Sequence, residues 1–413
     1  AAGAAGIAHQ ASEARREASR AAARFNEVRR LARAMLFDAH DELLRIPGTT
    51  RARRAIVETA SSYLDQIASD PAADAELRAE LGEAYLKLAD ALGYQYAPNL
   101  GDVEGARTAY ERGLALIAGL PPEHRSQRRT RIAEAKGHLN ATSIADESVI
   151  GVSDEVIERV RSSRDELIAL FESDSGEAAL GAEVIYGFLR YALSHNRTDN
   201  GHVRRDLLLE AESRSRPIAS MFPLDPDVAT AYADVLNWLG YFHFERGDAR
   251  GVEASAEAIV WCDRAIEISP GHPQARFIRA CVRMNEAIWL AKQNQREAAL
   301  DAMDDSMETV GSLAADDPAD LRAFRSLGVL SFHGATTLSH LATRDQVAGE
   351  LERARSDLQR AIGLVERQIT ILRERETRGW MYPWEGAYLP KADALRSELQ
   401  ERLEGLGAPS GGS

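Results

Sequence analysis

Residues 239–248 read Leu-Gly-Tyr-Phe-His-Phe-Glu-Arg-Gly-Asp, and they decide the fold class. Gly240 is a small residue at which a second helix can pack closely, and Gly247-Asp248 is typical of a turn. Small residues at helical spacing and a closing proline follow, at Ala258, Cys262, Ala265 and Pro270. This stretch therefore predicts two antiparallel helices, with about six extra residues before the second one.

The same arrangement recurs along the chain. In one copy Leu92-Gly93 and Tyr96 fit a first helix, Gly101-Asp102 fits the turn, and the second helix and its end are marked by Ala106, Tyr110, Gly113 and Pro121. Weaker copies begin at Pro273 and at Leu327-Gly328, the latter with a long insertion before Ala354, Leu358 and Ala361. Such repetition is typical of tetratricopeptide repeats. It predicts an all-α superhelical array of degenerate tetratricopeptide-type helix pairs.

The composition agrees with a helical array. Of the 413 residues, 45 % are hydrophobic and only 6 % aromatic, and helix-favouring residues dominate. The formal net charge of −14 argues against nucleic acid as a partner. Two cysteines exclude a disulfide framework and a Cys-based zinc site, although a bond between Cys262 and Cys281 stays open.

The chain divides into four segments by its helical pattern and its breaks. We expect a juxtamembrane-like helix over residues 1–50 and helical repeats over 51–140, with Thr49 or Thr50 as the N-cap. A polar stretch near 141–153 is the expected hinge. A second repeat array should span 154–406, with residues 389–406 as a capping helix, followed by a disordered tail over 407–413.

The first helices of stacked pairs line the concave face of such an array. The repeat register predicts a groove of acids, amides and aromatics, which favours an extended peptide or a protein surface as the ligand. The alternative is that these are ordinary solvated positions. The candidates are Lys87, Asp90, Tyr94, Asp234, Asn237, Tyr241, Glu245, Gln274, Phe277 and Asn285.

Two further groups of residues have a functional and a structural interpretation. Trp380, Tyr382 and Trp384 could form a stacking platform, but such clusters more often dock a terminal helix, which we favour. His333 and His340 lie seven residues apart, and we favour packing over metal binding because the spacing of a helical zinc motif is absent. We expect no metal and no cofactor.

The N-terminal third carries a more specific resemblance. It begins with residues 24–32, Arg-Phe-Asn-Glu-Val-Arg-Arg-Leu-Ala, continues through Ile46-Pro47-Gly48-Thr49-Thr50, and extends to Asn99-Leu100-Gly101-Asp102. Over roughly residues 10–120 the chain resembles the C-terminal region of bacterial membrane-anchored serine/threonine protein kinases. The resemblance implies a kinase domain and one membrane helix upstream, and it places this chain on the extracytoplasmic side.

The chain itself contains no kinase signature: it has no Gly-rich phosphate loop, no His-Arg-Asp and no Asp-Phe-Gly. We therefore expect no enzyme activity. The expected function is recognition of a protein or peptide, as the sensor or scaffold region of a receptor-type kinase. A stand-alone periplasmic or cytoplasmic scaffold and a small-molecule-binding helical sensor are the alternatives. A homodimer stays open, and membrane contact is expected only through an upstream segment.

Overall fold

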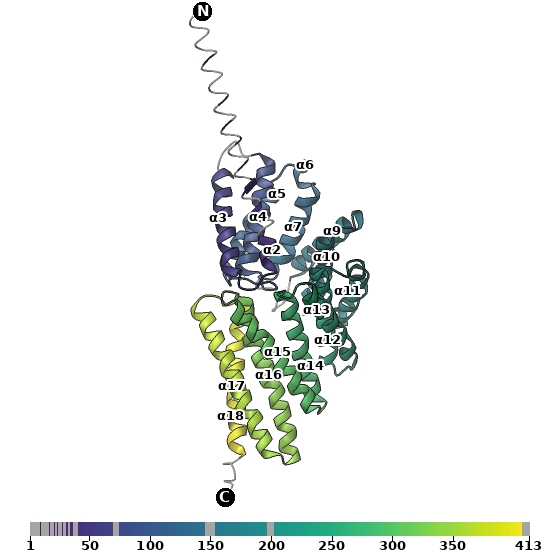
Figure 1. Cartoon of the computed structure of the whole chain (residues 1–413), viewed down its shortest axis with the longest axis vertical. Coiled ribbons are helices and arrows are strands. Elements are labelled where there is room, and N and C mark those ends of the chain that lie inside the picture. The colour runs from purple at the N-terminus through teal and green to yellow at the C-terminus, as the bar shows by residue number, and fades with distance from the viewer. Residues whose placement is uncertain are drawn as a thin grey trace, which may run out of the picture.

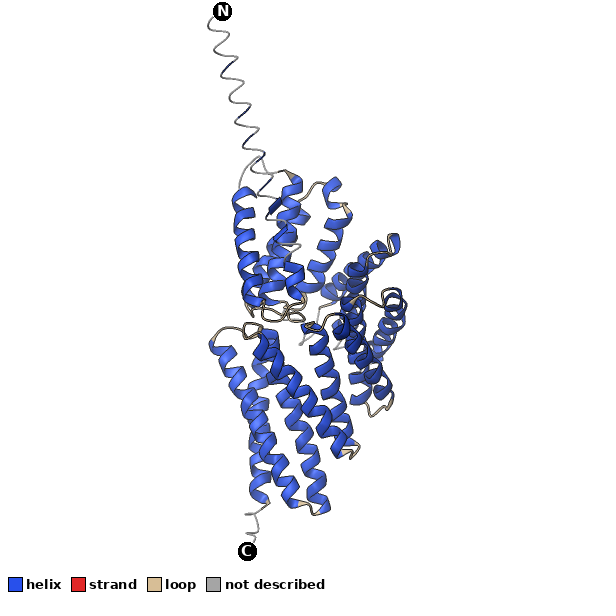
Figure 2. Ribbon diagram, in the orientation of Figure 1, coloured by secondary structure: helices blue, strands red, loops and turns tan. Residues whose placement is uncertain are grey.

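The computed structural model describes residues 40–68, 74–144, 153–195 and 202–406, together with isolated positions between 9 and 35. Most of the expected N-terminal helix, hinge residues 145–152 and tail residues 407–413 lie outside the described residues. The described residues form helices and no strand (Figure 2). These are α2 (His40–Leu44), α3 (Thr50–Ala68), α4 (Ala75–Gly93), α5 (Val103–Ala118), α6 (Pro122–Arg125), α7 (Arg128–Ala141), α9 (Asp154–Ser173), α10 (Ala178–Ser194), α11 (His202–Met221), α12 (Pro226–Glu245), α13 (Arg250–Ile268), α14 (Pro273–Lys292), α15 (Arg296–Asp316), α16 (Leu321–Ala348), α17 (Leu351–Thr377), the 3-10 helix η2 (Pro383–Ala387) and α18 (Tyr388–Gly405).

The helices pack as successive pairs, which confirms the predicted fold class. Helix α4 packs on α5, α7 on α9, α10 on α11, α12 on α13, α14 on α15, and α16 on α17. The first helices of neighbouring pairs also touch, in the order α10, α12, α14 and α16, and they form the inner row of the array. Helix α18 covers α17 as the predicted cap (Figure 1).

Local sequence explains where many helices begin. The side chains of Asp74, Asp102, Ser153 and Asp225 each accept a hydrogen bond from a backbone amide in the first turn of the helix that follows. Gly247 has a φ of 71°, which ends the α12–α13 turn at little steric cost. Helix α13 begins directly afterwards at Arg250, so the six extra residues expected before it are part of the helix.

The first repeat agrees with the prediction in part. Helices α4 and α5 approach closely at Gly93, where an added Cβ would lie 2.8 Å from Ala106 Cβ, and also at Gly82 and Gly113, where an added Cβ on Gly113 would lie 2.8 Å from the Gly82 carbonyl oxygen. Gly93 is the last residue of α4, and Leu81-Gly82 followed by Tyr85 is a second match to the motif about three helical turns earlier. Tyr96 was predicted on the first helix but lies in the loop after α4.

The fourth predicted unit contains no inserted loop. Helices α16 and α17 are 28 and 27 residues long, so the extra residues lengthen both helices of the pair. Gly334 lies inside α16, where Leu364 of α17 and Met303 of α15 pack around its Cα. The absent side chain allows this close packing and does not break the helix.

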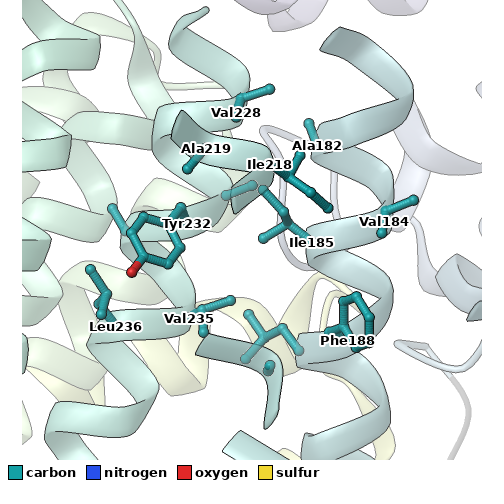
Figure 3. Close-up of a cluster of buried hydrophobic side chains, with 14 of the residues drawn as sticks. Ala182, Val184, Ile185, Phe188, Ile218, Ala219, Val228, Tyr232, Val235 and Leu236 are labelled. Atoms are coloured by element: carbon teal, nitrogen blue, oxygen red, sulfur yellow. The ribbon is translucent and has the colours of Figure 1, made fainter. Parts of the chain in front are cut away.

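The largest core cluster joins the middle pairs. Ile185 and Phe188 of α10 pack with Ile218 of α11 and Val235 of α12 (Figure 3). Tyr232 is fully buried in the same cluster, and its hydroxyl donates a hydrogen bond to Glu212 at 3.1 Å. Burial of apolar surface between neighbouring pairs is the main stabilising contribution in a stacked array.

The array curves until its first and last pairs meet. The loops at the lower end of the α3–α7 block face the loops at the upper end of the α14–α17 block (Figures 1 and 2). We call this contact the seam. It is formed by residues 45–50 and 93–101 on one side and by Asp227, residues 317–321 and Tyr382 on the other.

Directional polar contacts hold the seam. The Leu321 amide donates to the Asn99 carbonyl oxygen at 2.8 Å, and the Asn99 amide donates to Asp320 Oδ1 at 3.2 Å. The Thr50 amide at the start of α3 donates to Asp317 Oδ2 at 3.0 Å. Asp317 therefore caps α3, whereas the predicted cap Thr49 uses its hydroxyl to donate to the carbonyl oxygens of Leu43 and Ile46.

Replacing Asp317 tests the seam. Asp317→Ala leaves the buried Thr50 amide without an acceptor, and we expect the free energy of unfolding to fall by about 1 to 3 kcal/mol. The control is Asp316→Ala, which removes only a partly exposed ion pair with Arg276. Urea denaturation measures both variants. Equal losses of stability would show that Asp317 contributes nothing through the seam.

The close approach of α4 and α5 gives a second test. Gly113→Ala forces a methyl group against the Gly82 backbone, and we expect a loss of about 1 to 3 kcal/mol. Gly363→Ala on exposed α17 surface meets nothing within 4 Å, so it should raise stability by up to about 1 kcal/mol. Thermal and urea unfolding should give opposite signs. The same sign for both would contradict the close approach of Gly113 to Gly82.

Candidate functional site

Two cavities open on the concave side of the array. The first, of about 310 Å³, lies beside the seam and is lined from α4, α7, α10, α12 and the loops that end at α3 and α14. We call it the junction chamber. The second, of about 470 Å³, lies between α12, α14, α16, α17 and the capping helix α18, and we call it the cap chamber. No residue lines both chambers.

The structure divides the predicted groove residues between the two chambers. Lys87, Asp90, Tyr94 and Gln274 line the junction chamber. Asn237, Tyr241 and Asn285 line the cap chamber. The predicted residues are thus brought to the concave side but do not form one continuous groove.

Asp234 is buried between the chambers on α12. It lies one helical turn after Thr230, which lines the junction chamber, and one turn before Asn237, which lines the cap chamber. Its side chain is only 3 % exposed and accepts a hydrogen bond from Asn237 Nδ2 at 3.4 Å. Burial raises the pKa of Asp234 to about 7, because the charged carboxylate loses hydration.

The other predicted residues lie outside both linings. Glu245 accepts a hydrogen bond from the Tyr241 hydroxyl at 2.5 Å. Phe277 lies beneath the guanidinium of Arg322, whose carbon is 4.9 Å from the ring centroid. These contacts give both residues a packing role.

Within the aromatic turn after α17, Tyr382 docks onto the end of α4, whereas the prediction was docking of a terminal helix. Its ring is 3 % exposed, and its hydroxyl donates to the Gly93 carbonyl oxygen at 2.9 Å across the seam. Trp380 is partly exposed beneath Arg378, whose guanidinium carbon lies 4.4 Å from the ring. The side chain of Trp384 lies outside what the structure describes.

The cap chamber combines amides with aromatic rings. Asn285 Nδ2 donates to Asn237 Oδ1 at 3.0 Å, and Gln368 Oε1 is buried without a protein partner among the described residues. Trp238 and Tyr241 meet edge to face at 6.0 Å. Burial lowers the pKa of His333, so this ring is neutral at pH 7. The chamber therefore offers hydrogen-bonding groups and apolar rings, with Lys391 as the only lining residue of permanent charge.

The junction chamber is more highly charged. Arg45 and Asp227 form an ion pair at 2.6 Å, as do Lys136 and Glu183. His272 Nε2 lies 2.9 Å from Asp227 Oδ1. Arg190 lies among three tyrosine rings, and its guanidinium carbon is 4.8, 5.2 and 5.9 Å from the ring centroids of Tyr94, Tyr96 and Tyr186.

Sequence reasoning missed several lining residues. Tyr186 and Arg190 are on α10. This helix belongs to residues 153–222, which could not be assigned to the repeat register from the sequence. The available signal was that Tyr186 and Arg190 are four residues apart and therefore share one face of a helix. Tyr388 and Lys391 were missed because α18 was assigned only a capping role. His333 lines the cap chamber, but no group of three or more metal-binding side chains occurs in the described part of the chain.

Both cysteines are unbonded, and Cys281 lines the cap chamber while Cys262 is buried. Among the described helices, none has both the length and the apolar composition that crossing a bilayer requires.

Comparisons with known proteins show likeness only in fold. No protein-family model matches the sequence, and no curated protein does. The match to yeast Tom70 covers 90 % of this chain and 67 % of the Tom70 chain, with 12 % sequence identity and a TM-score of 0.37. The human IFIT1 dimer with PPP-AAAA is similar over 93 % and 86 %, with 11 % identity and a TM-score of 0.40. The assembly chaperone of RpL4, Acl4, is similar over 76 % and 98 %, with 16 % identity and a TM-score of 0.26.

The buried carboxyl of Asp234 makes stability depend on pH. Between about pH 4 and pH 7 only the folded state keeps this proton, so the stabilising contribution of protonated Asp234 is lost as pH rises toward 7. Asp234→Asn cannot titrate. Its stability relative to the parent protein should therefore increase from pH 5 to pH 8, by about 2 to 3 kcal/mol.

Urea denaturation at both pH values measures this difference. Asp304→Asn, on an exposed ion pair of α15, is the control and should show little change between the two pH values. A constant difference between Asp234→Asn and the parent protein at both pH values would contradict a raised pKa for Asp234.

Proposed function

We propose that this helical-repeat chain is a non-catalytic recognition module whose ligand enters the cap chamber. The observation that carries the proposal is the convergence of three amides, Asn237, Asn285 and Gln368, with four aromatic rings on the concave face. Amide side chains can donate to and accept from a peptide backbone, and aromatic rings bury apolar side chains. A short segment of a protein partner is the occupant that this combination fits best.

The unpartnered Gln368 oxygen supports this assignment. A buried acceptor without a partner is unfavourable in the free protein. Gln368 lines the chamber, and a turn of its amide toward the chamber would let a donor on the ligand satisfy this oxygen. Asn237 and Asn285 already bond to each other, so they keep their orientation before the ligand arrives. A ligand then loses less free energy in ordering the site.

A small molecule is the second candidate. The volume of about 470 Å³ lies within the range of small-molecule pockets, and the chamber is lined mainly by rings and amides. The separation of the two chambers also favours a compact ligand over a peptide that runs the length of the concave face.

Residues 10–120 resemble the C-terminal region of bacterial membrane-anchored serine/threonine protein kinases. We therefore propose that this module is the extracytoplasmic sensor or scaffold region of a receptor-type serine/threonine kinase. A stand-alone scaffold in the periplasm or cytoplasm is the alternative. Leu44 and Arg45 lie near the end of the N-terminal segment, residues 1–50, and also line the junction chamber. A change at the concave face would therefore reach the segment that leads toward the membrane, either in the pose of that segment or in dimerisation.

The cap chamber is tested by exchanging Asn285 for leucine, which removes the amide at similar volume. Random heptapeptides and a fragment library are screened for binders of the full chain. We expect binders to lose at least about tenfold in affinity to Asn285→Leu, equivalent to roughly 1.4 kcal/mol. Gln293 is the exposed C-cap residue of the same helix, and Gln293→Leu should bind like the parent protein.

Peptide binders alone would support partner recognition, and fragment binders alone would support the small-molecule candidate. Binders whose affinity is equal for the parent protein, Asn285→Leu and Gln293→Leu would show that the cap chamber is not the site.

A further inference from the structure

We propose that the junction chamber is a binding site for a small organic anion that carries one carboxylate or phosphate group, held by Arg190 and Arg53. This inference goes beyond the proposed function, because it concerns the other chamber and a different ligand chemistry. It rests on two buried guanidinium groups that form no ion pair among the described residues, although carboxylates farther away favour their charge.

Arg190 is 8 % exposed and has an incomplete set of hydrogen bonds. Its Nη1 donates to the Leu139 carbonyl oxygen at 3.2 Å and to Asn140 Oδ1 at 2.8 Å. Its Nε and Nη2 donate to no described residue, yet neither atom is sealed off from solvent. Since Arg190 lines the junction chamber, these two donors are open to it.

The charge of Arg190 also lacks a contacting anion, although Asp90 and Asp234 favour it electrostatically from a distance. No carboxylate of the described residues forms an ion pair with it, and burial lowers its pKa to about 10. Asp90 forms no ion pair with Arg190. Its carboxylate already accepts hydrogen bonds from the Tyr110 hydroxyl and from Asn140 Nδ2. A buried cation without a contacting anion is unfavourable, and an anionic ligand would remove that cost.

Arg53 repeats this situation in the same chamber. It is 2 % exposed, and its Nη1 donates to the Pro98 carbonyl oxygen at 3.1 Å. Its Nε is sealed from solvent without a partner, so Nη2, which donates to no described residue, is the donor that a ligand could reach. Burial lowers its pKa to about 10 as well. The other basic lining residues already have partners: Arg45 and Lys136 are in ion pairs, and Lys87 has a polar or electrostatic interaction of its own. Arg53 and Arg190 are therefore the guanidiniums available for an anion.

The lining limits the ligand in size and charge. A volume of about 310 Å³ is at the small end of ligand pockets. Asp90, Glu183 and Asp227 also line the chamber and would repel a polyanion. Tyr94, Tyr96 and Tyr186 pack around Arg190 and give the chamber an aromatic wall. A planar guanidinium binds carboxylate and phosphate in the same bidentate manner, so both groups fit.

The experiment measures the Tm of the full chain with sodium benzoate, phenyl phosphate and inorganic phosphate, against sodium chloride at equal ionic strength. At 10 mM we expect at least one anion to raise the Tm by about 2 °C or more. Arg190→Gln and Arg53→Gln should abolish the shift, and Arg190→Lys should restore part of it. Arg107→Gln, on an exposed ion pair of α5, should keep the full shift.

The choice of anions separates the two ligand chemistries. A shift with benzoate alone assigns a carboxylate, and a shift with the two phosphates alone assigns a phosphate. Equal shifts in the parent protein and Arg190→Gln would overturn the proposal, as would the lack of a shift with all three anions. If Arg190→Gln does not fold, Arg53→Gln and Arg190→Lys decide in its place. Asn285→Leu should keep the anion response, so failure of either chamber's proposal leaves the other standing.

Discussion

The hydrogen bond from the Leu321 amide to the Asn99 carbonyl oxygen brings the two ends of the array together, and the concave side depends on this contact. An open superhelix would expose the inner faces of α4, α12 and α14 to solvent in one groove. Closure at the seam places the loop after α4 beside α10 and α12, which converts part of that groove into a partly covered chamber. The seam is polar and directional, so it fixes orientation where apolar packing alone would allow sliding.

Enclosure changes the chemistry of the side chains that it covers. On an open helix surface Arg190 and Asp234 would be hydrated and would titrate normally. Inside the array burial shifts both pKa values toward neutrality, to about 10 and about 7. Perturbed groups in a cavity are typical of binding sites, and here they mark the concave face of α10 and α12. Residues of α12 line both chambers, so this helix forms one wall of each.

The repeat architecture could be predicted from sequence because small residues such as Gly240 and Cys262 recur where helices pack closely. Register was harder: Leu81-Gly82 and Leu92-Gly93 both match the motif, and both glycines pack closely on α5, at Gly113 and at Ala106. Lengthened helices α16 and α17 were mistaken for an insertion, since a local pattern does not reveal how far a helix continues. The seam and Arg190 were missed because both depend on the curvature of the whole array, which no short motif encodes.

The seam also changes how such a chain can fold. A linear solenoid folds from contacts between sequence neighbours, and each repeat stabilises only the next one. Here the Thr50 amide and Asp317 are 267 residues apart, so their contact raises the average sequence separation of native contacts. Long-range closure of this kind slows folding, because the entropy of the intervening chain is lost before the contact forms. In return the first and last repeats share one cooperative unit, and fraying at one terminus is opposed by the other.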